Sequence, residues 1–345
     1  MKEITFVKGY KEEIPTKYLN NLLQLFQENH KEIYLENPPT REYFEKYWVF
    51  PFVPEIKRKY VLAIDSEEKI IGYSYLQWRI KYDNLDKGYF WTYITRNERR
   101  KGYGTRLVRE LVKEIPAQIT KITTDAFLDT PGYFFIENFG KEKSYQEIIS
   151  IADLTKFNRK KVSQTAKTLR KNANKRGYEF LFIKNLKHSL FLNFKKFVKM
   201  VESIWNDMPV EELSYDKEEL PLERYQRGLE RRINLGNEVL TFVVLEKQTN
   251  NPIGMTCTFV NKFQPHIAIQ DDTGILHQHR GYNLGLTLKY QMLEKLLEET
   301  DAKIWRTGNA QSNKHMLRIN EKLQHQPFQR INVYEYESEV FTELV

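Results

Sequence analysis

A glycine-rich turn between a predicted strand and a predicted helix has the composition of a phosphate-binding loop. Residues 99–104 read Arg-Arg-Lys-Gly-Tyr-Gly and lead into an apolar stripe of helical spacing. The first N–H groups of a helix have no intrahelical acceptor, and the helix dipole places a partial positive charge at that end. The two glycines would let the backbone approach an anion closely, and the three basic side chains would add mobile positive charge. The sequence therefore predicts a pyrophosphate cradle formed by Arg99, Arg100, Lys101, Gly102, Tyr103, Gly104 and Thr105. Ile94 and Thr95, at the end of the preceding strand, complete the predicted binding site.

A second loop of the same kind lies 179 residues further along the chain, counted from Gly102 to Gly281. It follows a predicted strand that carries Asp271 and Asp272, and its sixth position is Asn283 in place of a small residue. Asn adopts positive φ more readily than most residues, so we expect the turn to survive. The predicted second site comprises Thr273, Gly274, Ile275, Gln278, His279, Arg280, Gly281, Tyr282, Asn283, Leu284 and Gly285.

The two loops match the pattern R/Q-x-x-G-x-G/A, the first completely and the second up to its sixth position. With a strand before each loop and a helix after it, the chain resembles the GNAT N-acetyltransferase superfamily. Its second half looks like a tandem-GNAT group to which mycothiol synthase-like proteins belong. The resemblance implies acetyl-CoA as the donor, with its pyrophosphate in the cradle.

The resemblance also has implications for the last helix of each half. It implies that Asn309 and Asn313 belong to the cofactor site and that Asn313 contacts the pantetheine arm of CoA. Asn309 and Asn313 could instead be a helix N-cap and a first-turn residue. Many GNAT enzymes place a tyrosine on this helix, which protonates the leaving thiolate. The corresponding positions are Ile136 and Asn320, so neither half has this tyrosine.

Acetyl transfer from a thioester to an amine requires a polarised carbonyl and a base that takes a proton from the amine. We expect backbone N–H groups of a splayed strand, at 94–96 or 273–276, to polarise the carbonyl. Asp272 is the predicted base, although it could instead cap a turn or pair with an arginine. Strand alternation would turn Asp271 to the opposite face. Because only the second half has an acid on this strand, that half is predicted to carry out the chemistry.

The elements that must position these residues recur in the same order in both halves. Three extended segments precede each loop, and a helix, a strand, a short helix and a closing strand follow it. The closing strands are predicted at 145–154 and 331–337. The predicted fold class is α/β, with two GNAT-like modules, each a mixed central β-sheet flanked by α-helices. The modules are predicted at 1–155 and 177–345, joined by a basic linker or helix at 156–176.

Charge is concentrated in that joining segment. The 345 residues carry a net charge of +8, yet residues 156–176 hold nine Lys or Arg and no acid. The rest of the chain therefore has a net charge of −1. We interpret the segment as a solvated helix or linker, and a clamp for phosphates or nucleic acid is the alternative.

Composition also indicates the cellular location of the protein. Apolar runs are far shorter than the ~20 residues of a membrane span, and the N-terminus has no apolar signal-like stretch. The single cysteine, Cys257, excludes an intrachain disulfide. A cytoplasmic monomer or homodimer is therefore expected, without a membrane, metal or nucleic-acid partner.

The predicted function is direct transfer of an acetyl group from acetyl-CoA to a primary amine of a small molecule. Two alternatives remain open. One is a non-catalytic acyl-CoA-binding or sensing protein, and the other is a nucleic-acid-associated acetyltransferase that uses the basic segment.

Overall fold

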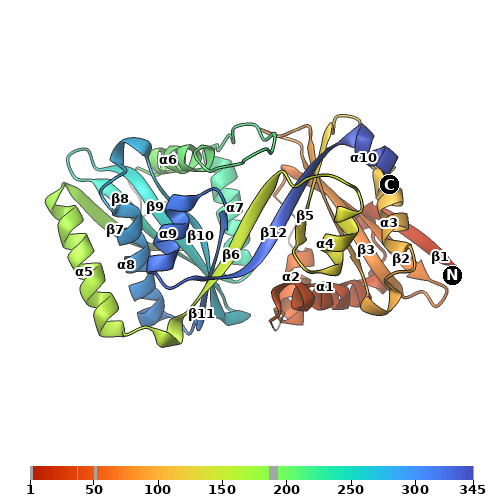
Figure 1. Cartoon of the computed structure of the whole chain (residues 1–345), viewed down its shortest axis with the longest axis horizontal. Helices are drawn as coiled ribbons and strands as arrows, with labels where there is room; N and C mark the ends of the chain where they lie inside the picture. Colours follow the sequence, from red (N-terminus) through yellow and green to blue (C-terminus); the bar gives the residue numbers. More distant parts are fainter. Residues whose placement is uncertain (1–2, 37, 50–52, 186–192, 345) are drawn as a thin grey trace. The chain divides into compact units, whose positions relative to one another are not determined.

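The computed structural model describes residues 3–36, 38–49, 53–185 and 193–344, which pack into two compact units (Figure 1). Unit 1 comprises Met1–Gln146, Val210–Asp216 and Arg330–Val345, and unit 2 comprises Glu147–Pro209 and Lys217–Gln329. None of the helices in the described part of the chain is long and apolar enough to cross a membrane.

Unit 1 contains a mixed β-sheet in which, among the strands described, β4 and β5 are the one parallel pair. The strands run in the order β1 (Ile4–Tyr10), β2 (Ile56–Asp65), β3 (Ile70–Arg79), β4 (Lys87–Ile94), β5 (Lys121–Phe127) and β12 (Gln326–Glu337). Alternating side chains of β2 enter different cores, because successive residues of a strand face opposite sides. Tyr60 and Leu62 pack with α1 (Leu19–Tyr34) and α2 (Arg41–Val49). Val61 and Ala63 pack on the other face, with α3 (Tyr103–Val112), α4 (Pro131–Glu137) and α10 (Ser338–Leu344).

Unit 2 repeats this arrangement, with β10 and β11 as its parallel pair. Its strands run in the order β6 (Tyr145–Asp153), β11 (Ile304–Ala310), β10 (Gln264–Ile275), β9 (Asn251–Asn261), β8 (Asn237–Glu246) and β7 (Tyr178–Lys184). One face carries α6 (Phe194–Asn206) and α7 (Leu222–Asn234). The other carries α5 (Arg159–Lys175), α8 (Leu284–Glu299) and α9 (Lys314–Lys322). Two mixed sheets with helices on both faces confirm the predicted architecture.

The two closing strands are exchanged relative to the predicted modules. β6 pairs antiparallel with β11 of unit 2, with Ile304 opposite Asp153. β12 pairs antiparallel with β5 of unit 1, with Ile331 opposite Phe127. The expected boundaries at 155 and 177 therefore differ from the observed units, because each half of the chain donates its last strand to the sheet of the other half.

The basic segment is a helix of unit 2. Within α5, Val162, Ala166 and Ala173 are buried, and Val162 and Ala173 belong to the core that includes α8. Asn158 caps its N-terminus by accepting a hydrogen bond from the Lys161 N–H at 3.1 Å. The segment predicted as a joining linker or helix thus packs as one of the helices that cover the second sheet.

Candidate functional site

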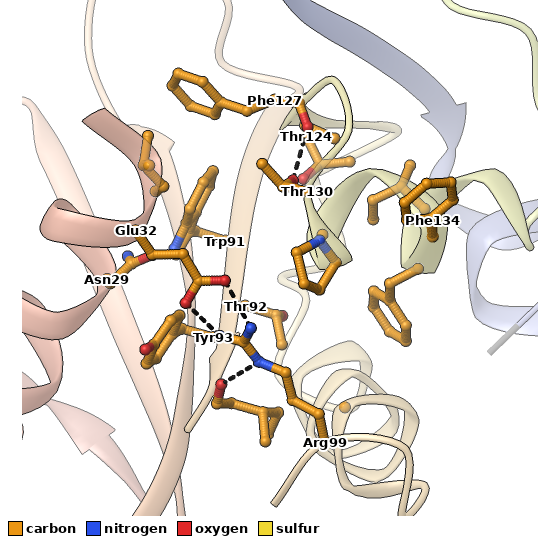
Figure 2. A pocket seen from close by; sticks show the side chains of 18 of the residues that line it. Asn29, Glu32, Trp91, Thr92, Tyr93, Arg99, Thr124, Phe127, Thr130 and Phe134 are labelled. Atoms are coloured by element: carbon orange, nitrogen blue, oxygen red, sulfur yellow. Dashed lines mark hydrogen bonds and ion pairs between the residues drawn. The ribbon is translucent and has the colours of Figure 1, made fainter. Parts of the chain in front are cut away.

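A cavity of about 680 Å³ lies in unit 1 where β4 and β5 diverge. These strands are paired only over Lys87–Tyr89 of β4 and 121–123 of β5. Beyond that point the cavity is lined by both strands, the N-terminus of α3, and side chains of α1 and α4. Figure 2 shows Glu32 of α1 on one side of this space and Phe134 of α4 on the other. The parting of a parallel strand pair thus creates the cavity.

Arg99 anchors the loop between β4 and α3. Its Nε donates to the Ile94 carbonyl at 2.9 Å, and its two terminal nitrogens donate to the Glu32 carboxylate at 2.6 and 2.7 Å (Figure 2). Lys101 pairs with Glu98 at 2.9 Å. The prediction of three mobile charges was therefore wrong for Arg99, because a bidentate ion pair holds its guanidinium in one place.

The backbone of this loop has the shape expected of an anion cradle. Gly102 precedes α3 at φ 77°, and Arg100 lies at φ 61°. Both residues line the cavity, together with Gly104 and Thr105. A Cβ on Gly104 would lie 3.4 Å from the Phe135 ring, so a large side chain there would enter the space between α3 and α4. The first N–H groups of α3 have no intrahelical acceptors and are available to a ligand.

Unit 2 builds the same loop from different residues. Arg280 Nε donates to the Ile275 carbonyl at 2.9 Å, and Arg280 Nη2 donates to Asp207 at 2.7 Å. Asn283 precedes α8 at φ 59°, as expected from its tolerance of positive φ, and Gly281 lies at φ 88°. The loop of unit 2 therefore has the same tether and the same pair of positive-φ residues as the loop of unit 1.

This equivalence corrects the alignment made from the sequence. The tethers make Arg280 the counterpart of Arg99, which places Gly281 opposite Arg100 and Asn283 opposite Gly102. The repeat across the loops is therefore 181 residues, and Gln278 has no tethering role. The sequence alignment followed the glycines, but one of the two positive-φ positions is occupied by a non-glycine residue in each unit.

A second cavity, of about 320 Å³, lies beside the loop of unit 2. It is lined by Gly281, Tyr282 and Asn283, and by Lys175 and Arg176 at the end of α5. The Arg176 guanidinium lies 5.3 Å from the centre of the Tyr282 ring. His279 accepts or donates a hydrogen bond with Tyr178 at 3.1 Å, within a 3-10 turn at His277–His279. The basic side chains that line this cavity, Lys175 and Arg176, therefore lie at the end of α5 and not in the loop.

Only some of the expected backbone N–H groups are available at the diverging strands. The Thr95 N–H donates to Ile71 and the Leu276 N–H donates to Ile253, both at 2.9 Å, so each is used by the neighbouring strand. N–H groups alternate in direction along a strand. The N–H groups of Ile94 and Ile275, one residue earlier, therefore face the gap between the parallel strands.

Asp271 and Asp272 both face α6 and α7, which contradicts the expectation that strand alternation separates them. Asp271 accepts from Arg232 of α7 at 2.7 Å, and Asp272 accepts from Trp205 Nε1 of α6 at 2.7 Å. The register between β10 and β9 shifts between Gln270 and Thr273. This bulge inserts one extra residue and breaks the alternation. The buried Gln270 side chain supports it by donating to the Cys257 carbonyl at 2.6 Å.

The environment of Asp272 suits proton transfer near neutral pH. Burial and the negative charge of Asp271 raise the pKa of Asp272 to about 7, against the opposing effects of the Trp205 hydrogen bond and the Arg232 charge. A base is most effective when its pKa lies near the working pH. The geometry therefore keeps Asp272 as a candidate base.

The last helix of unit 2 holds a buried polar network in place of a tyrosine. Asn313 caps α9 and accepts from the Met316 N–H at 3.1 Å. Asn320 donates to Asn309 and accepts from Lys289 Nζ, both at 2.6 Å. Burial lowers the pKa of Lys289 to about 7. The structure thus favours the N-cap role of Asn313, and it ties Asn309 to Asn320.

Sequence reasoning missed two carboxylates of the unit 1 cavity. Glu32 comes from α1 and Asp125 from β5, and both line the cavity. Asp125 accepts a hydrogen bond from the Tyr89 hydroxyl, and burial raises its pKa. Asp125 was detectable as an acid inside a β-branched strand, but its proximity to the loop depends on the pairing of β4 with β5. Unit 1 therefore has a candidate base of its own.

Breaking the Glu32–Arg99 pair should destabilise unit 1. Glu32→Ala leaves a largely buried guanidinium without its carboxylate, so we expect the free energy of unfolding to fall by about 2 kcal/mol. Urea denaturation of Glu32→Ala, Arg99→Met and the double variant measures this. The double variant should recover part of the loss, since it removes both charges. Equal additive losses would contradict a coupled pair.

These features define a class of protein. Two parallel strands of a mixed sheet separate, and the N-terminus of a helix lies beside the gap between them. Residues 19–140 match the acetyltransferase (GNAT) family model. This stretch of unit 1 therefore matches a GNAT acetyltransferase domain, and similar solved structures show the GNAT fold over both units.

Several solved structures with the same fold align with nearly the whole chain. A tandem GNAT protein from the clavulanic acid biosynthesis pathway has a TM-score of 0.75 and 17% identity, covering 97% of this chain and 99% of its own. A GCN5-related N-acetyltransferase from Sphaerobacter thermophilus has a TM-score of 0.63 and 12% identity, covering 96% of both chains. N-myristoyltransferase of Saccharomyces cerevisiae, solved with myristoyl-CoA, has a TM-score of 0.56 and 12% identity, covering 98% of this chain and 80% of its own. No curated protein sequence matches the chain.

Proposed function

We propose that this protein transfers an acetyl group from acetyl-CoA directly to a primary amine of a small molecule. The observation that carries the proposal is the duplicated loop. Each unit tethers an arginine to the end of the strand, turns at two positive-φ residues, and starts a helix beside the parting strands. Such a helix N-terminus binds phosphate through its free N–H groups and its dipole.

In this proposal both units bind acetyl-CoA. The N–H groups that open α3 and α8 hold the pyrophosphate, and Gly104 and Gly285 leave room for it. Arg100 adds charge in unit 1, whereas Lys175 and Arg176 add it in unit 2. The thioester supplies the activated acetyl group, and the N–H groups of Ile94 and Ile275 face its carbonyl.

Unit 2 carries out the transfer, with Asp272 as the base. Its carboxylate takes a proton from the bound ammonium, so that the neutral amine can attack. Trp205 holds that carboxylate in place through its 2.7 Å hydrogen bond. Neither Ile136 nor Asn320 can donate a proton to the thiolate as a tyrosine would, so we assign that step to water.

The acceptor class rests on two kinds of support. A deprotonatable carboxylate between α6 and α7 suits a protonated amine. Two proteins of similar fold are named for small-molecule chemistry, the clavulanic acid pathway protein and a glucosamine N-acetyltransferase region. A panel of polyamines, amino sugars, aminoglycosides and amino-acid derivatives, assayed by release of the CoA thiol, tests this class. Binding of acetyl-CoA without transfer to any of them would favour a sensing protein.

Calorimetric titration of acetyl-CoA tests the two-site proposal. We expect two sites in the wild type, and Gly104→Phe and Gly285→Phe should each remove one by filling its cradle. These glycines are structurally equivalent, and Gly104→Ala is the matched control, since a Cβ there meets Phe135 at an ordinary distance of 3.4 Å. Binding lost completely in Gly104→Phe alone would restrict the donor to unit 1 and remove Asp272 from the mechanism.

A further inference from the structure

The exposed face of α5 carries a concentrated positive charge. The helix carries seven Lys or Arg and no acid, and all seven are exposed. With 100° between successive residues they fall within an arc of roughly 200°, while Val162, Ala166 and Ala173 occupy the opposite side. At ~1.5 Å per residue, this basic face is about 26 Å long.

This face is not arranged as a solvated helix face usually is. Elsewhere the chain neutralises helical lysines and arginines with acids one turn away, as in Arg41–Glu45, Lys199–Glu202 and Lys295–Glu299. Among the described residues, no ion pair involves the basic side chains of α5. Lys167, Lys171 and Lys175 instead follow one another at four-residue spacing, and each such like-charge pair costs a helix about 0.2–0.5 kcal/mol. These like-charge pairs lower the stability of α5, and their presence indicates that the helix binds a polyanion.

We propose that α5 binds the phosphate backbone of duplex nucleic acid. Three observations favour duplex nucleic acid over other polyanions. The apolar side of α5 is buried against unit 2, so it has no apolar face to insert into a lipid surface. It contains no aromatic residue on which the bases of a single strand could stack. Lysines about 6 Å apart along a helix suit consecutive phosphates of a regular backbone.

The proposal does not depend on the acetyltransferase activity. Of the basic side chains of α5, Lys175 lines the cavity of unit 2, and the other six are not among the residues that line it. Contacts to phosphates alone carry no sequence information, so binding should be independent of base sequence. If about five side chains neutralise phosphates, log K should fall with log salt at a slope of about −4.5.

Fluorescence anisotropy with labelled DNA and RNA duplexes of about 20 base pairs tests the proposal, since these exceed the ~26 Å length of α5. We expect wild-type affinity to fall several-hundred-fold between about 50 and 200 mM salt. The variant Lys160→Gln, Lys167→Gln, Arg170→Gln, Lys171→Gln should flatten the slope to about −1. The DNA and RNA arms show which duplex binds more tightly.

A control variant separates local contacts from overall charge. Lys57→Gln, Lys81→Gln, Lys141→Gln, Lys143→Gln removes the same charge from exposed positions of unit 1 and should leave duplex affinity unchanged. An equal loss in both variants would overturn the proposal, as would absence of wild-type binding at about 50 mM salt. Tighter binding to a single strand, or to phosphatidylserine vesicles, would also overturn it. The substituted residues are all exposed, so we expect the variant to fold, and an unchanged circular dichroism spectrum checks this.

Discussion

Replacing Asp272 by asparagine should lower kcat/KM by about 100-fold or more, because a positioned general base contributes roughly that factor. In the wild type, kcat/KM should rise with pH through about 7, the pKa to which burial and Asp271 raise Asp272. The sign follows from the role of the group, since a base acts only when it is deprotonated. The asparagine variant should lack this rise.

Substitutions of the two residues beside Asp272 should shift the pH at which kcat/KM rises in opposite directions. Asp271→Asn removes a negative charge that raises the pKa of Asp272, so the rise in kcat/KM should shift to lower pH. Trp205→Phe removes a hydrogen bond that stabilises the carboxylate, so the rise should shift to higher pH. Both should retain more activity than the asparagine variant at high pH.

Asp125→Asn is the matched control in unit 1. It removes a buried carboxylate from the other candidate site and should leave the rate of transfer unchanged. An unchanged rate in Asp272→Asn together with a large loss in Asp125→Asn would move the chemistry to unit 1.

Lys289→Met should stabilise the protein at pH 7. The ammonium is buried on α8 with Asn320 as its hydrogen-bond partner, and burial lowers its pKa from 10.5 to about 7. At about 1.4 kcal/mol per pKa unit, this shift bounds the penalty at about 5 kcal/mol. The variant also loses the bond to Asn320 and the contact of the ammonium with the Trp305 ring. We therefore expect a net gain of about 2 kcal/mol.

The gain should depend on pH in a defined direction. Between about pH 7 and 10.5 the unfolded chain binds a proton at Lys289 that the folded protein does not. Wild-type stability therefore rises with pH across this window, and the advantage of the methionine variant shrinks. Denaturant unfolding at pH 7 and at pH 9 measures the difference.

Lys295→Met provides the control on the same helix. Lys295 is partly exposed and pairs with Glu299, so its replacement should change stability by less than about 0.5 kcal/mol at either pH. A Lys289→Met variant that is less stable than the wild type at both pH values would show that the polar network outweighs the cost of burial.

Local patterns in the sequence determined much of this protein. The stripe that includes Leu107 and Leu111 predicted α3, and both residues are buried in the core that α3 covers. The loops predicted the positive-φ turns, including the one at Asn283. Recurrence of the same elements in the same order predicted two modules. These inferences succeed because helix periodicity, strand periodicity and turn chemistry are properties of neighbouring residues.

Tertiary structure decided which elements and residues meet. β6 and β12 are both read as closing strands, so nothing local shows that each completes a sheet built mainly from the other half of the chain. The tether of Arg99 to Glu32 and the approach of Asp125 to the cavity join residues far apart in the chain. The bulge that turns Asp271 and Asp272 to the same face arises from the register of β10 against β9. Pairing and register are selected by contacts summed over a whole sheet, and such long-range contacts leave no pattern in any one segment.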